Sequence, residues 1–123
     1  MRDVRFESTL ARLYDVRGDR IITGTFWDGD SCNMIFQIKE DKYIEISSDE
    51  NFEAFTEDVF IENAEDYTEY VKKINKRYGT EWDEDKRRLY IRFRRNDMSI
   101  SEAVMRLHGA MMLIAALDWY IYA

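Results

Sequence analysis

The single histidine of the chain, His108, is the residue type best suited to acid–base chemistry near neutral pH. A general base needs a group that orients it and a nucleophile within hydrogen-bond reach. No nucleophile motif stands beside His108, which precedes Gly109 in a largely apolar stretch. We therefore expect a packed, hydrogen-bonded histidine, and the sequence predicts no catalytic residue.

Residues 28–31 (Asp-Gly-Asp-Ser) have the acidic residues that begin a calcium-binding loop. Such a loop also needs a glycine at its sixth position and a glutamate at its twelfth, where Lys39 stands. We interpret the run as a hairpin turn, because its residue types favour turns. Cys32 is the only cysteine, so neither an internal disulfide nor a paired-cysteine metal motif can form. The sequence predicts no metal site and no cofactor.

Charge is strongly separated along the chain. Residues 43–71 contain ten acidic residues and no basic residue, whereas residues 72–95 contain ten basic residues. Carboxylates in a row can imitate the phosphates of nucleic acid, and an acidic face is attracted to a basic groove. The predicted partner-binding surface consists of Asp49, Glu50, Glu53, Glu57, Asp58, Glu62, Glu65, Asp66 and Glu69. The alternative is that the two segments neutralise each other on the folded surface or are simply solvated.

The basic segment contains a second candidate around Tyr90, Arg92 and Arg94. Arginine beside an aromatic residue can bind a phosphate and stack on a base. The alternative is that these arginines pair across the sheet with Glu81 and Asp83 on the neighbouring strand. The net charge of −7 argues against direct binding of nucleic acid.

Length and composition predict one soluble domain. The chain has 123 residues, 46% of them hydrophobic, and neither a proline nor a repeat divides it. The N-terminus has no apolar stretch of signal-peptide type. The longest uncharged stretch near the C-terminus, residues 107–117, is shorter than the roughly 20 residues that cross a bilayer. We expect a single domain over residues 1–123, no membrane contact and a cytoplasmic location.

The hydrophobic pattern predicts five strands and three main helices. The expected strands cover residues 20–26, 33–39 and 43–46, which form a meander, and residues 80–82 and 89–93, which form a hairpin. The expected helices cover residues 2–16, residues 63–78 and residues 101 to about 122, while residues 47–63 suggest a short helix and an irregular apolar stretch. Ser99 and Glu102 have the spacing of a capping box before the last helix, which is apolar on nearly every face from Gly109 onward and is therefore expected to be buried.

The expected fold class is α+β, with an antiparallel sheet of about five strands packed on the long C-terminal helix. The order of these elements resembles the domain-of-unknown-function 1828 family, which comprises small domains of bacteria and their phages. The matching segments are residues 25–26 with 28–30, 43–46, 74–79, 89–91, 107–112 and 116–120. Residues 47–50 (Ser-Ser-Asp-Glu) depart from the Asp-Asp-Gly that is usual in the family. The resemblance implies a bacterial, phage or mobile-element setting and no particular chemistry.

These features indicate three alternative functions. The first is a non-enzymatic, phage-encoded inhibitor that blocks a nucleic-acid-targeting defence complex of the bacterial host, such as a CRISPR nuclease, through the acidic residues. The alternative is a regulatory or antitoxin-like subunit that binds one protein partner, or a second copy of itself, through the apolar C-terminal helix with its aromatic end at residues 119–122. An enzyme is the third, since a nuclease needs clustered carboxylates with a divalent ion, and no spacing here selects such a site.

Overall fold

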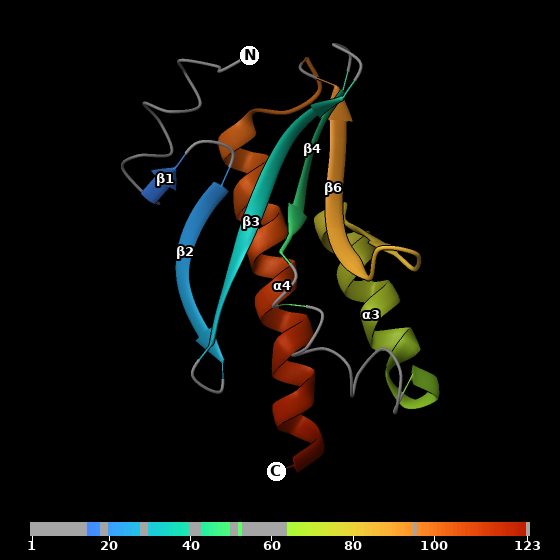
Figure 1. The fold of residues 1–123 in the computed structure, drawn as a ribbon. Coiled ribbons are helices and arrows are strands. Elements are labelled where there is room, and N and C mark those ends of the chain that lie inside the picture. Colours follow the sequence, from blue (N-terminus) through green and yellow to red (C-terminus); the bar gives the residue numbers. More distant parts are fainter. Residues whose placement is uncertain are drawn as a thin grey trace.

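The computed structural model describes residues 15–17, 20–27, 30–39, 43–49, 52, 64–94 and 96–122. In this part of the chain, six strands form one antiparallel sheet in the order β1-β2-β3-β4-β6-β5 (Figure 1). The strands are β1 (Asp15–Arg17), β2 (Arg20–Trp27), β3 (Asp30–Lys39), β4 (Tyr43–Ser48), β5 (Glu81–Asp83) and β6 (Arg88–Arg94). Two long helices, α3 (Ala64–Tyr78) and α4 (Ile100–Tyr122), complete the described fold.

The antiparallel pair of β4 and β6 shows how the sheet contributes to the core. Ile46 pairs with Ile91 and Ile44 pairs with Phe93, and all four side chains are buried. Their neighbours along each strand are half-buried or exposed, so both strands alternate with the period of two that a sheet with one covered face requires. The sheet therefore has an inner face under the helices and an outer face.

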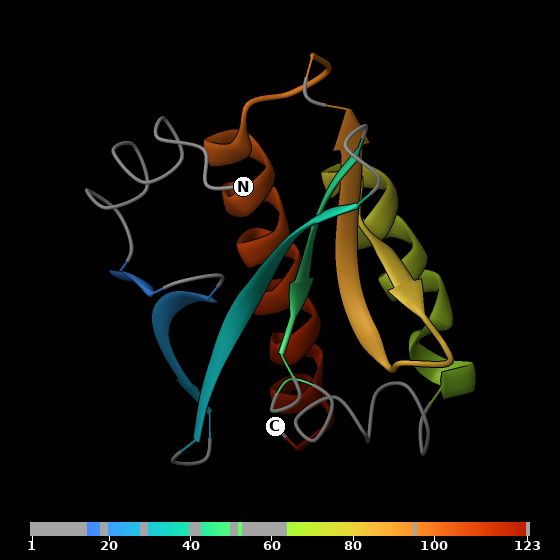
Figure 2. The ribbon, with the colours of Figure 1, turned by 45° about the horizontal axis from the view of Figure 1, so that its top comes forward.

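The outer part of the sheet bends. The register between β2 and β3 shifts between Ile21 and Thr25, so that β2 contains more residues than the matching stretch of β3. Gly24 lies within this irregularity, and glycine is common where a strand bulges. Figure 2 shows β2 and β3 curving relative to β4 and β6.

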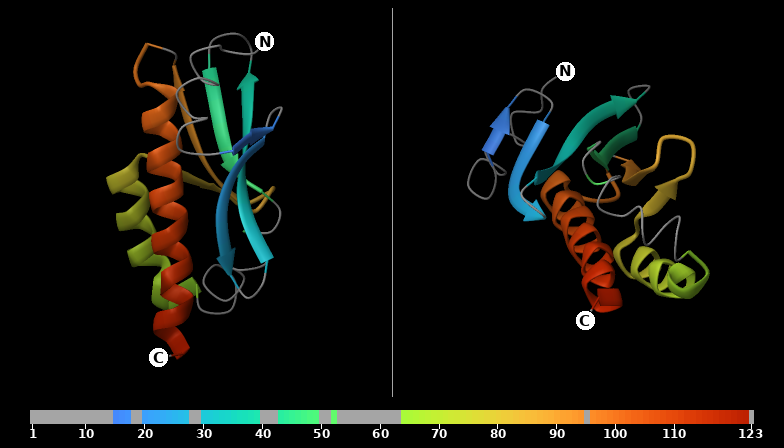
Figure 3. Two further views of the ribbon diagram at one scale, coloured as in Figure 1. Left: turned by 90° about the vertical axis from the view of Figure 1, so that its left-hand side faces the viewer. Right: turned by 60° about the horizontal axis from the view of Figure 1, so that its bottom comes forward.

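Both helices lie on the same side of the sheet (Figure 3). The core between the two layers contains Ile21, Ile44, Ile46, Phe52, Val71, Leu89, Ile91, Phe93, Ala103, Val104, Leu107, Ala110, Met111, Ile114 and Ala115. Seven of these residues come from α4, at positions spaced along one helical face. The long C-terminal helix is thus the main element that covers the sheet.

The end of α3 is set by a glycine. Gly79 has a φ of 73°, the left-handed conformation that glycine adopts without steric cost, and its N–H donates to the Asn75 carbonyl oxygen at 2.8 Å. The Thr80 hydroxyl donates to the Asn75 side-chain oxygen at 2.8 Å. These bonds end the helix and send the chain into β5.

By length and composition alone, Ile100–Leu117 of α4 would be long and apolar enough to cross a membrane, with a mean hydropathy of 1.4. This segment is longer than the uncharged stretch at residues 107–117 because it also includes the charged residues Glu102 and Arg106. One face of this helix packs into the core described above, as core helices of globular proteins do.

The predicted α+β class, with an antiparallel sheet and a long C-terminal helix, is confirmed, whereas the count of about five strands is not. The predicted hairpin is confirmed by the pairing of β5 with β6. Of the predicted capping box, the Ser99 half is confirmed, because the Glu102 N–H donates to the Ser99 hydroxyl oxygen at 3.1 Å, whereas the Glu102 carboxylate pairs with Arg106. The predicted leading helix is wrong at its end: residues 15–17 form β1, because they pair with residues 20–22 of β2. Residues 1–14 and 28–29 lie outside the described residues, so the rest of that helix and the tip of the turn are not placed.

Candidate functional site

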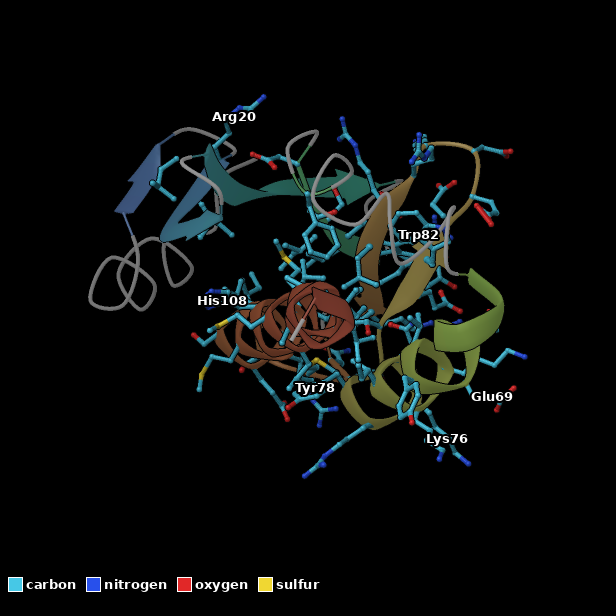
Figure 4. All side chains as sticks on the ribbon, turned by 90° about the horizontal axis from the view of Figure 1, so that it is seen from below. Arg20, Glu69, Lys76, Tyr78, Trp82 and His108 are labelled. Atoms are coloured by element: carbon cyan, nitrogen blue, oxygen red, sulfur yellow. The ribbon has the colours of Figure 1, made fainter. Side chains whose placement is uncertain are left out.

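Only some residues of the predicted acidic surface lie in the described part of the chain. Asp49 is 2% exposed, and its Oδ1 accepts the Phe52 N–H at 3.4 Å, so its carboxylate belongs to a buried turn and not to an exposed face. Glu69 is exposed and lies on the outer side of α3 (Figure 4). The described residues do not include Glu50, Glu53, Glu57, Asp58 and Glu62.

The charges of α3 follow the dipole of the helix. By position, Glu65 and Asp66 lie in its first turn, whereas Lys76 and Arg77 lie in its last. Negative charge near the N-terminus and positive charge near the C-terminus both stabilise a helix. This order favours the structural interpretation of part of the charge separation, because it needs no partner.

Arg92 and Arg94 lie on the outer face of the sheet, with partners that the sequence analysis did not predict. Arg92 Nη2 lies 3.1 Å from Glu45 Oε1 on β4, and Arg94 Nη2 donates to the Tyr43 hydroxyl at 3.3 Å. The prediction that these arginines pair with Glu81 and Asp83 is wrong, because β5 is opposite residues 88–90 only. Both guanidinium groups also lie near aromatic rings, Arg92 at 5.9 Å from Tyr90 and Arg94 at 5.5 Å from Tyr43.

A small hollow of about 70 Å³ lies on this outer sheet face. It is lined by Glu45, Ser47, Asp83, Lys86, Arg88 and Tyr90. Burial raises the pKa of Tyr90, and a hydrogen bond with Glu81 raises it further, so the phenol stays protonated. The two acidic and two basic groups of the lining balance in charge, and this hollow therefore has no net attraction for a phosphate backbone.

His108 is half-buried on α4. Desolvation lowers its pKa below the ordinary value of 6.5, so the imidazole is neutral at physiological pH. Within the described ranges, no group of three or more histidine, cysteine, aspartate or glutamate side chains could hold a metal ion. The structure thus gives His108 a half-buried place on α4.

The helix layer has an apolar outer face. Four large apolar side chains of the described residues are exposed, and all four lie on α3 or α4. They are Tyr70 at 55%, Met105 at 57%, Met112 at 46% and Leu113 at 42%, and we call them the outer helix face. The prediction that α4 is a central buried helix is therefore wrong for one side of it.

At one end of this face, an open hollow of about 680 Å³ lies between the last turn of α3 and the first turns of α4. It is lined by Arg77, Tyr78, Ser99, Ser101, Glu102, Met105 and Arg106, and we call it the helix-end hollow. Arg106 is held on its rim: Nη2 lies 3.1 Å from Glu102 Oε1, and Nη1 donates to the Tyr78 carbonyl oxygen at 3.5 Å. Arg77 is exposed on the opposite rim.

The apolar C-terminal helix was predicted as an alternative partner-binding element, with its aromatic end at residues 119–122, but neither the exposed face at Met105 and Met112 nor the helix-end hollow was predicted. The signal that would have found the outer helix face is the spacing of Met105 and Met112, which are seven residues apart and so lie on one side of a helix. The apolar residues on its other sides obscured this spacing.

Comparisons of the chain with family models, with curated proteins and with solved structures found no match.

Proposed function

We propose that this chain is a non-enzymatic protein-binding domain whose contact surface is the outer helix face. The observation that carries the proposal is the exposure of Met105, Met112 and Leu113 on the helix whose opposite face forms the core. Fully burying one such side chain contributes roughly 1.5–3 kcal/mol, so covering these three would supply much of the free energy of a specific complex.

Methionine and aromatic side chains are enriched at the centres of protein interfaces, and methionine adapts its shape to a partner. Exposed residues of both types occur on the helix layer, with Tyr70 on α3 and the two methionines on α4. Arg77, Glu102 and Arg106 line the helix-end hollow beside Met105, and charged residues are common in the rim of an interface. A regulatory or antitoxin-like subunit, or a homodimer, would use a surface of this kind.

The test is affinity capture from a bacterial lysate with quantitative mass spectrometry. The wild-type chain is compared with a Met112→Lys/Leu113→Lys variant and with a control, Asp85→Asn/Asp97→Asn, which changes the net charge equally at exposed positions elsewhere. The proposal predicts one stoichiometric protein that resists nuclease treatment, is retained by the control and is lost from the lysine variant. Equal capture by all three folded chains would contradict it.

A second candidate function is inhibition of a nucleic-acid-targeting defence complex of a bacterial host, in the cytoplasm, by a chain that a phage or mobile element encodes. It is supported by the run of ten acidic residues and no basic residue at 43–71, and by the exposure of Glu69. Carboxylates at this density suit a basic groove that normally holds nucleic acid. The resemblance to the domain-of-unknown-function 1828 family points to the same setting.

The test of this second function uses a quadruple variant that removes four of the acidic charges, Glu53→Gln/Glu57→Gln/Asp58→Asn/Glu62→Gln. In bacteria with active CRISPR interference, expression of the wild-type chain is expected to restore plaque formation by a targeted phage. The folded quadruple variant is expected to lose this protection. Full protection by the variant would exclude the acidic residues as the inhibitory surface.

A further inference from the structure

We infer that the helix-end hollow binds an acidic segment of a partner protein, with an apolar side chain of that segment seated against Met105 and Tyr78. This inference rests on the proposed protein-binding function, which it makes specific by naming the chemistry of the partner. The hollow has about 680 Å³ of open space, enough for one or two side chains.

The charge of the hollow selects an acidic partner. Two guanidinium groups, those of Arg77 and Arg106, face one carboxylate, that of Glu102. Arg106 is oriented by Glu102 and by the last carbonyl of α3, so Arg77 is the cation that an incoming carboxylate can engage on the exposed rim. An arginine can bind a carboxylate through two parallel hydrogen bonds.

The surroundings of the hollow add positive charge. Lys73 and Lys76 are exposed on α3 together with Arg77, and Figure 4 shows Lys76 pointing outward from that helix. The N-terminus of α4 contributes a positive partial charge from the same direction. The positive electrostatic potential of these groups speeds the encounter with an acidic partner and repels a basic one.

The lining of the hollow includes two large apolar or aromatic residues, Met105 and Tyr78, which favours a peptide over a bare anion. Met105 is 57% exposed there, and the Tyr78 ring is half-buried between the helices. A free phosphate would leave this apolar surface uncovered, and the net charge of −7 disfavours a nucleic acid. A peptide with an aliphatic or aromatic residue between glutamates covers this surface and reaches the rim together.

The test uses the full chain and a fluorescein-labelled peptide, Glu-Glu-Leu-Phe-Leu-Glu-Glu, with fluorescence anisotropy as the readout. We expect saturable binding that weakens as salt is raised, and about tenfold weaker binding of the same peptide with glutamine in place of glutamate. Arg77→Glu should weaken binding about tenfold and Met105→Ala about fivefold. The matched control is Lys72→Glu, which makes the same change of charge on α3. Because Lys72 lies about 140° around the helix from Arg77, this substitution should alter binding less than about twofold.

Equal affinities of the Arg77→Glu and Lys72→Glu chains would overturn the inference, as would displacement of the peptide by a single-stranded oligonucleotide. Self-association of the wild-type chain that Arg77→Glu abolishes would overturn it too, because the occupant would then be a second copy. If the peptide fails to bind while Met112→Lys/Leu113→Lys still loses the captured protein, the inference fails and the proposed function stands.

Discussion

The ring of Tyr78, the last residue of α3, lies directly against Gly109 in the middle of α4. A Cβ added at position 109 would lie 2.9 Å from Cε1 of that ring, closer than such atoms come in real structures. The missing side chain of Gly109 therefore lets the last turn of α3 pack closely against α4. Because Tyr78 also lines the helix-end hollow, the same contact shapes the candidate binding site.

Gly109→Ala is expected to destabilise the protein by about 1 kcal/mol, because the clash with Tyr78 outweighs the gain of up to about 1 kcal/mol that alanine brings to a helix. In a Tyr78→Ala background the clash is absent, so the same substitution should be neutral or stabilising. Urea denaturation of the four chains of this cycle measures both effects. Equal stabilisation by Gly109→Ala in the two backgrounds would show that the Tyr78 ring does not oppose a side chain at position 109.

Ser48 gives a second prediction, because its hydroxyl is buried and accepts the Leu89 N–H at 3.1 Å. Ser48→Ala leaves that backbone donor buried without its acceptor and should cost about 1–3 kcal/mol of unfolding free energy. Ser47→Ala, next to it on the outer face of the sheet, should cost less than about 0.5 kcal/mol. Equal midpoints of chemical denaturation for the two variants would show that this hydrogen bond contributes little.

The pattern of the strands could be predicted from the sequence, and the pairing of their side chains could not. Leu89, Ile91 and Phe93 alternate with polar residues, so the inner face of β6 follows from the period of two. The partner of Arg92 is Glu45, 47 residues away in the chain, and only the sheet register brings them together. Local pattern contains no information on such a register.

The exposed side of α4 escaped prediction for a related reason, although the helix itself was predicted as an alternative partner-binding element. α4 is apolar on several sides, so its sequence does not indicate which side faces solvent. That side is decided by the positions of the sheet and of α3, which leave Met105 and Met112 exposed while Met111 is buried. A strand at residues 15–17 was likewise unpredictable, since only pairing with β2 makes this short segment extended.

The lowered pKa of His108 makes the stability of the protein depend on pH. Desolvation lowers its pKa in the folded protein below 6.5, so the unfolded chain binds the proton at higher pH than the folded one. The contribution of this residue to stability is full above pH 6.5 and is lost as the pH falls toward the folded pKa. His108→Gln should remove this part of the pH dependence, measured as unfolding free energy at a series of pH values. An unchanged slope in the variant would refute the assignment.

The most direct test of the outer helix face is methyl NMR of the chain labelled at its six methionines and titrated with the protein that it captures. Met105 and Met112 are exposed on α4, whereas Met111, beside Met112 in the sequence, is 3% exposed and serves as an internal control. We predict that the Met105 and Met112 methyl signals shift or broaden on binding, while the Met111 signal changes little. Unchanged Met105 and Met112 signals in a formed complex would contradict the proposal that this face is the contact surface.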